Sequence, residues 1–171
     1  MPRLTIRAEE PEDRPIAHVT TAAFGKKREA RIIDAIRDSD GYVPELSLVA
    51  ELKGRIVGHA ILSYVELAGD PRRVLELGPI SVVPERQREG IGSALIREAL
   101  LRADERGEPL VLVLGHAEYY PRFGFRPSRE LGIAPPDPEI PDDVFLAIPL
   151  TAYDPTLRGR VVLSPAFARH A

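Results

Sequence analysis

Residues 75–95 read LELGPISVVPERQREGIGSAL, an apolar run followed by a polar turn and two closely spaced glycines. The apolar run predicts a strand, and after Gly90 apolar side chains return at the spacing of a helix. The first N–H groups of a helix have no partner within it and carry the positive end of its dipole. Because glycines allow an anion to approach these groups closely, the segment predicts a phosphate-binding turn between strand and helix.

The strand of this segment is interrupted at Gly78-Pro79, because proline has no N–H to donate to a sheet ladder. If the strand is central, the ladder opens there and leaves backbone groups of Ile80 and Val82 free for a ligand. A linear molecule with amide groups could pair with them, and pantetheine, which is joined to a pyrophosphate, is such a molecule. Two common nucleotide-binding folds are disfavoured, since neither a G-x-x-x-x-G-K-[ST] loop nor a G-x-G-x-x-G fingerprint is present.

The patterns on both sides of this segment predict a mixed α/β domain. Strands are expected at residues 4–8, 46–52, 55–65, 74–83 and 111–114, and helices at about 9–24, 28–37 and 90–106. Only Lys53-Gly54 separates the second and third strands, which is typical of a tight antiparallel hairpin. The strand-helix-strand unit that ends at residue 114 is a crossover connection, so its two strands should be parallel neighbours.

Length and composition favour a single domain over residues 1–171, with a C-terminal strand region at 127–171 that holds eight of the 17 prolines. The net charge of −3 argues against a protein that coats nucleic acid. No apolar run approaches the ~20 residues of a membrane span, and the N-terminus does not resemble a signal peptide, so we expect a cytoplasmic protein. With no cysteine and four scattered histidines, we expect no metal site.

Two motifs resemble those of a known family. The spacing Gln87-x-x-Gly90-x-Gly92 resembles the Q/R-x-x-G-x-G/A signature of the GNAT N-acetyltransferase superfamily, and YYPRFGF at 119–125 resembles its later Y-x-x-x-G-F segment. The runs LGPISVVP, LVLGHAEYYPRFGF and LRGRVV are similar to a bacterial branch of mostly predicted acetyltransferases. The resemblance implies a GNAT-like fold, with a central mixed sheet of about six to seven strands, a splayed and bulged central strand, and about four flanking helices.

The resemblance also implies acetyl-CoA as the co-substrate, with its pyrophosphate held by backbone N–H groups of the glycine turn. The residues assigned to this role are Gln87, Arg88, Gly90, Ile91, Gly92 and Ser93. Either Arg86 or Arg88 would add positive charge. Ile80 and Val82 would pair with pantetheine, and the Ile80 N–H would polarise the thioester carbonyl.

Acetyl transfer to an amine requires a base, because an amine with a pKa near ~10.4 is almost entirely protonated at neutral pH. In some members of the family a glutamate on the bulged strand acts through water, and the resemblance assigns that role to Glu76, with His116 or water alone as alternatives. The family's tyrosine that protonates the departing thiolate corresponds to Tyr120, and the adjacent Tyr119 is its alternative. His59, inside an apolar strand, is expected to be a hydrogen-bonded sheet residue.

The resemblance therefore implies an N-acetyltransferase that moves an acetyl group from acetyl-CoA to a primary amine. Direct transfer in a ternary complex is expected, since no cysteine is present to carry an acyl intermediate. The alternative is a non-catalytic module that binds or senses acyl-CoA.

The acceptor is expected to be a small-molecule or peptide amine, with a protein lysine also open. The N-terminal helices, residues 66–73 and the proline-rich tail would surround it. Acidic side chains in these segments would attract a cationic amine; they are Asp70, Asp137, Glu139, Asp142 and Asp143. Homodimers are common in the superfamily, so the resemblance leaves a homodimer open.

Overall fold

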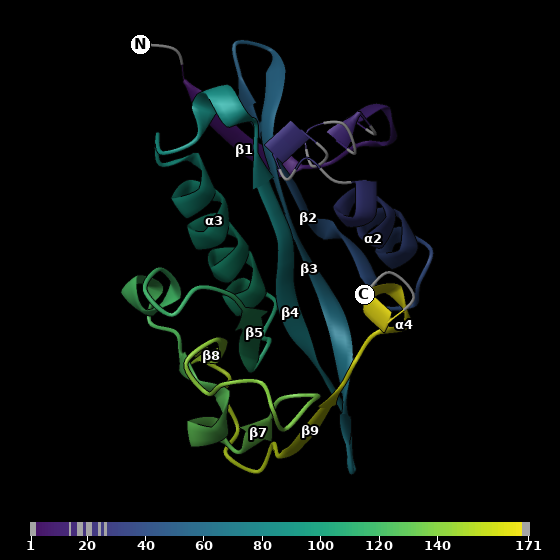
Figure 1. Cartoon of the computed structure of the whole chain (residues 1–171), viewed down its shortest axis with the longest axis vertical. Coiled ribbons are helices and arrows are strands. Elements are labelled where there is room, and N and C mark those ends of the chain that lie inside the picture. The colour runs from purple at the N-terminus through teal and green to yellow at the C-terminus, as the bar shows by residue number, and fades with distance from the viewer. Residues whose placement is uncertain are drawn as a thin grey trace.

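The computed structural model describes residues 3–13, 15–16, 19, 22–23, 25 and 27–168. Within them, nine strands form one mixed sheet (Figure 1). The strands are β1 (Leu4–Ala8), β2 (Tyr42–Leu52), β3 (Arg55–Ala68), β4 (Asp70–Val82), β5 (Leu110–Leu114), β6 (Arg126–Pro127), β7 (Ile133–Ala134), β8 (Phe145–Pro149) and β9 (Gly159–Val162). The helices are α2 (Lys27–Arg37), α3 (Ile91–Glu105) and the single turn α4 (Pro165–Ala168), with 3₁₀ turns η1 (Pro11–Asp13), η2 (Pro84–Arg86), η3 (Tyr120–Phe123) and η4 (Ser128–Leu131).

The sheet follows the order β1-β2-β3-β4-β5-β8-β6, and β9 pairs with both β3 and β7. The predicted hairpin is confirmed, since β2 and β3 are antiparallel neighbours. The predicted crossover is confirmed as well, because β4 and β5 are parallel and α3 connects them. Strand β9 pairs with Glu66–Ala68 of β3, so the C-terminal part of the chain extends the middle of the sheet.

Strands β4 and β5 separate after three paired residues. β4 pairs with β5 only at Leu75, Glu76 and Leu77, while it stays paired with β3 as far as Val82. The separation follows directly on Gly78-Pro79, whose peptide bond is cis. The β5 side of β4 is therefore open beyond Pro79, as the missing proline N–H predicts.

The helices cover opposite faces of the sheet (Figure 1). Helix α3 buries a stripe of apolar residues against β2, β3 and β4; its buried members are Ile91, Leu95, Ile96, Ala99 and Ala103. On the other face, α2 and α4 pack together over Ile61 through Ile32, Ile36 and Ala166. Helices therefore cover both faces of the sheet, and β4 stays open only along its edge beyond Pro79.

Two details of the expected fold need correction. Four flanking helices were expected, but the described residues contain two long helices, α2 and α3, and the single turn α4. The helix predicted near residues 9–24 falls largely outside the described residues, and its described start, Pro11–Asp13, is a 3₁₀ turn. The sheet has nine strands rather than six or seven, because the proline-rich region adds the short strands β6, β7 and β9.

Among the described residues, no helix combines the length and the apolar composition needed to cross a bilayer.

Candidate functional site

The predicted phosphate turn connects β4 to α3. Arg88 and Gly90 have positive φ values of 67° and 85°, and Gly90 is the left-handed N-cap of α3. No side chain caps the helix, so its first N–H groups have no side-chain acceptor. This end of α3 can therefore accept an anion from outside the chain.

A cavity of about 490 Å³ opens at this helix end. Its walls contain most of the residues predicted for the cofactor; these are Val82, Gln87, Arg88, Gly90, Ile91, Gly92 and Ser93. Arg86 and Arg122 add two guanidinium groups to the same walls. The Val82 carbonyl, however, already accepts a hydrogen bond of 3.1 Å from the Gln87 side chain. Pairing of pantetheine with that carbonyl would require the Gln87 amide to move.

A second cavity, of about 880 Å³, lies where β4 and β5 separate. It is lined by Glu76 to Ile80 of β4, by Leu114 to His116 at the end of β5, and by Tyr119 and Tyr120. Its remaining walls come from α2, from α3, from the segment 136–145 and from residues 160–163. The two cavities have Gly92 and Tyr119 in common, so a ligand at the helix end can continue to the open edge of β4.

Glu76 faces the second cavity from β4 and is half-buried. In the part of the chain that the structure describes, its carboxyl makes no side-chain hydrogen bond or ion pair. Burial among protein atoms raises the pKa of Glu76 to about 7. A carboxyl with this pKa can gain and lose a proton near neutral pH, which is what a general base requires.

Tyr120 and Tyr119 occupy different environments. The Tyr120 ring lies on Gly115 so closely that a Cβ added there would be 2.1 Å from a ring carbon. Burial raises the pKa of Tyr120 to about 12, and within the described residues its hydroxyl has no hydrogen-bond partner. The Tyr119 hydroxyl instead shares a hydrogen bond of 3.0 Å with the Ser93 hydroxyl, and Arg122 covers its ring at 4.6 Å. Tyr120 is therefore the tyrosine of the pair whose hydroxyl is available.

The other predicted residues differ in whether they line the second cavity. His116 is exposed on the second cavity, as its position after β5 predicts. Of the acidic residues expected around an acceptor, Asp137 lines this cavity, whereas Asp70 pairs with Arg72 and Asp142 with Arg129. Residues 66–73 do not line it, because they form the ends of β3 and β4 rather than a loop.

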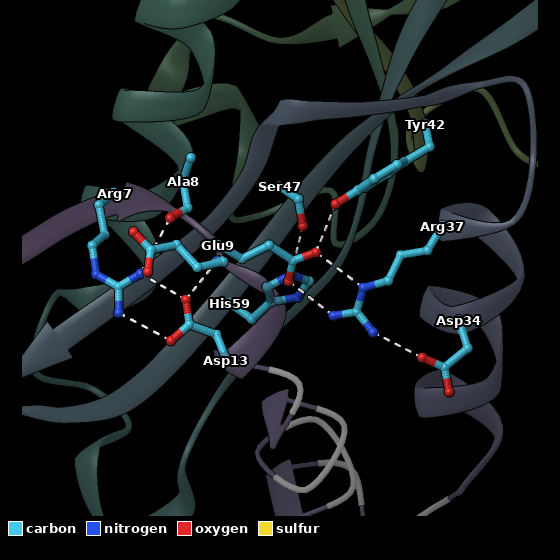
Figure 2. Close-up of polar contacts among 10 residues, drawn as sticks. Arg7, Ala8, Glu9, Asp13, Asp34, Arg37, Tyr42, Ser47 and His59 are labelled. Atoms are coloured by element: carbon cyan, nitrogen blue, oxygen red, sulfur yellow. Dashed lines mark hydrogen bonds and ion pairs between the residues drawn. The ribbon is translucent and has the colours of Figure 1, made fainter.

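A buried polar cluster on the α2 side of the sheet was missed at the level of sequence (Figure 2). Glu9 accepts hydrogen bonds from Arg37 at 2.9 and 2.8 Å and from Tyr42 at 2.9 Å. His59 Nε2 lies 3.0 Å from the Ser47 hydroxyl and 3.5 Å from Glu9 Oε2, as expected of a hydrogen-bonded sheet residue. The expectation is incomplete, however, because His59 Nδ1 is buried with no hydrogen-bond partner among the described residues.

Comparisons with known proteins agree with this geometry. A family model described as an acetyltransferase (GNAT) domain matches residues 44–127. The uncharacterized N-acetyltransferase YjhQ of Escherichia coli (strain K12) is 36% identical over 152 residues, which are 85% of this chain and 83% of YjhQ.

Two solved structures are similar over nearly their whole length. A GNAT family acetyltransferase from Brucella melitensis in complex with acetyl-CoA has a TM-score of 0.79 and 34% identity, covering 96% of this chain and 98% of that one. YhbS from Escherichia coli in complex with CoA has a TM-score of 0.89 and 26% identity, covering 99% and 94%. With these relatives covering both the turn before α3 and the separated strands, the chain belongs to the GNAT superfamily of N-acetyltransferases.

Proposed function

We propose that the protein transfers the acetyl group of acetyl-CoA to a primary amine, directly and within a ternary complex. The observation that carries the proposal is the pair of adjoining cavities: one opens at an uncapped helix N-terminus, and the other contains Glu76, a carboxyl with a pKa of about 7. An anion-binding end beside a cavity with a proton acceptor is what acetyl-CoA and an amine need in order to meet.

The cofactor half of the site is supported by the shape of the backbone. The N–H groups between Gln87 and Ser93 would hold the pyrophosphate, with Arg86 or Arg88 as counter-charges. The open edge of β4 at Ile80 and Val82 would take the amides of pantetheine, and the Ile80 N–H would polarise the acetyl carbonyl. The relatives solved with acetyl-CoA and CoA support the same ligand for this chain.

The transfer step divides between two side chains. Glu76 would accept one proton from the ammonium group through water and leave a neutral amine. As the amine nitrogen bonds to the acetyl carbon and the C–S bond breaks, Tyr120 would donate its proton to the departing sulfur. The second proton of the nitrogen then restores the tyrosine, and the products are the acetylamide and free thiol. The acceptor would be a small-molecule or peptide amine.

Calorimetric titration of the purified, ligand-free protein tests the cofactor half. Acetyl-CoA and CoA should bind at micromolar concentration, while ATP and NAD, which lack pantetheine, should not. Thiol release on addition of primary amines then tests the transfer. Binding of acetyl-CoA without thiol release from any amine would favour a binding or sensing module, and a folded protein that binds neither CoA species would overturn the proposal.

A further inference from the structure

Four large hydrophobic side chains are exposed among the described residues, and three of them line the second cavity. These are Leu114, Val162 and Leu163, with 55, 43 and 44% of their surface exposed, while the fourth, Leu101, lies on α3 away from either cavity. Exposed apolar surface that gathers around a cavity is typical of a ligand site.

The three side chains divide between the two ends of this cavity. Leu114 ends β5, beside the open edge of β4 where a pantetheine chain would lie. Val162 is the last residue of β9 and Leu163 follows it before α4, and both line the cavity together with Ile32 of α2. Ile32 of α2 and Ile140 add further apolar surface to the cavity. Apolar side chains therefore gather at the end of the cavity near α2, apart from the cofactor, beside the charged residues of that end.

Glu29 is the acidic side chain that α2 contributes to this end of the cavity, next to Arg28. It projects from α2 into the cavity lining, and its Oε2 atom is buried without a hydrogen-bond partner among the described residues. Buried carboxylate oxygens in folded proteins nearly always accept hydrogen bonds, so an unpaired one on a cavity wall indicates a missing donor. A primary ammonium group, with three N–H donors, is the donor that an amine acceptor supplies.

The other charged side chains at this end of the cavity are Arg28, Asp137 and Arg160. Arg28 is a cation and cannot accept a hydrogen bond from an ammonium group, and the other two are less suited to that role. Asp137 is exposed, and its Oδ1 already accepts a hydrogen bond of 2.9 Å from the Glu139 N–H. Arg160 is exposed as well, and its guanidinium donates to the Pro135 carbonyl at 3.5 Å. A second charge on the acceptor would therefore meet solvent-exposed groups, whereas an uncharged apolar body would cover Val162 and Leu163.

We propose that the acceptor is a primary amine on an aliphatic or aryl body, whose ammonium group donates to Glu29 while its body covers Val162 and Leu163. The inference rests on the proposed acetyl transfer, since it identifies the class of amine that this reaction would use. Glu29 is the residue that selects the amine, and Glu76 remains the base.

Four amines of equal chain length test the preference: hexylamine, 6-aminohexan-1-ol, 1,6-diaminohexane and 6-aminohexanoate, with 2-phenylethylamine as the aryl member. At saturating acetyl-CoA, thiol release should give kcat/KM values for hexylamine and phenylethylamine at least about tenfold above the other three, because their far ends remove apolar surface from water. A preference for the diamine or for the aminocarboxylate would overturn the proposal.

Substitutions test the residues. Glu29→Gln should raise the KM for hexylamine about tenfold with little change in kcat or in acetyl-CoA affinity, and Leu163→Ser should remove the preference for hexylamine over aminohexanol. The matched controls are Glu105→Gln and Leu101→Ser on α3, which should leave both quantities unchanged. Because Glu29→Gln removes the charge from a carboxylate whose buried Oε2 has no hydrogen-bond partner among the described residues, its melting temperature should equal or exceed that of the unsubstituted protein. An unchanged KM in Glu29→Gln would overturn the assignment.

A binding measurement separates this inference from the proposed function. Hexylamine is titrated into the protein saturated with CoA, and the titration is repeated with Glu29→Gln. Binding that Glu29→Gln loses supports the acceptor site even if no amine ever releases thiol, in which case acetyl transfer alone would fail. Thiol release from other amines, without hexylamine binding, would overturn the acceptor class and leave acetyl transfer standing.

Discussion

At the scale of single residues, Glu76 gives the activity a predicted pH dependence. Its pKa is raised to about 7 by burial, and the base acts in its deprotonated form. With saturating amine and acetyl-CoA, kcat should therefore rise as the pH increases through about 7. Glu76→Gln should lower kcat by about 10²- to 10⁴-fold and remove this limb of the profile.

His116 provides the control for that profile, because it also faces the second cavity and is the alternative base. His116→Gln should keep both the value of kcat and its rise with pH near 7. Should His116→Gln remove the limb while Glu76→Gln retains it, the two roles would have to be exchanged.

The contact between Tyr120 and Gly115 gives a prediction about the acid. A Cβ at residue 115 would overlap the Tyr120 ring at 2.1 Å, so Gly115→Ala must displace that ring. We expect a fall in kcat similar to that of Tyr120→Phe, with CoA affinity retained, since neither residue lines the cavity at the helix end. Steady-state kinetics combined with calorimetry checks both quantities. If Tyr119→Phe lowers kcat more than Tyr120→Phe does, then Tyr119 is the acid.

At the scale of elements, the N-terminus of α3 should distinguish anion binding from simple packing. Gly92 lies in the first turn, and a Cβ there would make only ordinary contacts, 3.7 Å from the Tyr119 hydroxyl and 3.9 Å from a Val82 methyl. Gly92→Asp should not destabilise the helix, because a carboxylate near a helix N-terminus is favourable. It should, however, repel the pyrophosphate.

The matched variant Gly92→Asn has the same shape without the charge. Calorimetry should give a Kd for CoA at least about tenfold weaker in Gly92→Asp than in Gly92→Asn, a difference of about 1.4 kcal/mol. The difference between the two Kd values should become smaller as salt is added, because salt screens charge repulsion. Equal affinities in the two variants would argue against a phosphate at this helix end.

The elements differ in how far the sequence predicts them. The hairpin, the crossover and the opening after Pro79 are all encoded locally, by a two-residue turn, by helical spacing and by a missing N–H. Strands β6 and β7 are only two residues long, which is too short for any periodicity to show, and their pairing depends on distant partners.

The residues of the candidate site also differ in how far the sequence predicts them. The residues of the cofactor turn are consecutive in sequence, so a motif reveals them, and all of those assigned line the cavity at the helix end. Glu29 has no such signal, because an acidic residue in the first turn of a helix is common. His59 and Glu9 lie 50 positions apart in the chain, and only the pairing of β1, β2 and β3 brings them together.

At the scale of the whole molecule, the Glu9 cluster makes folding stability sensitive to acid. Burial opposes the ionisation of Glu9, but hydrogen bonds from His59 and Arg37 outweigh it and hold the pKa of Glu9 well below its usual range. Burial lowers the pKa of His59, since a proton on its unpartnered Nδ1 would be a buried charge. At both residues the unfolded chain binds a proton at a higher pH than the folded chain does. Acid therefore lowers the free energy of unfolding through both of them.

The His59 contribution should be lost as the pH falls below about 6.5, and that of Glu9 only below about 4.3. Glu76 acts in the opposite direction between these values, because its raised pKa makes the folded form bind the proton first. The measurement is therefore a difference between variants: urea unfolding of the unsubstituted protein and of His59→Gln at pH 6.5 and 5.

Relative to His59→Gln, the unsubstituted protein should lose up to about 2 kcal/mol of unfolding free energy over that interval. Parallel pH dependences in the two proteins would mean that His59 carries a proton in the folded state.

The second cavity takes part of its lining from outside the segment that matches the family model, which bears on how such an enzyme changes in evolution. Residues 82–93, at the helix end, lie inside the segment 44–127 that matches the family model, whereas Glu29, Ile140, Val162 and Leu163 lie outside it. Drift or recombination in the flanking segments could therefore replace the proposed amine with another while the proposed acetyl donor is kept. Two descendants of one ancestor could in this way diverge in what they modify without an intermediate that has lost the ability to acetylate.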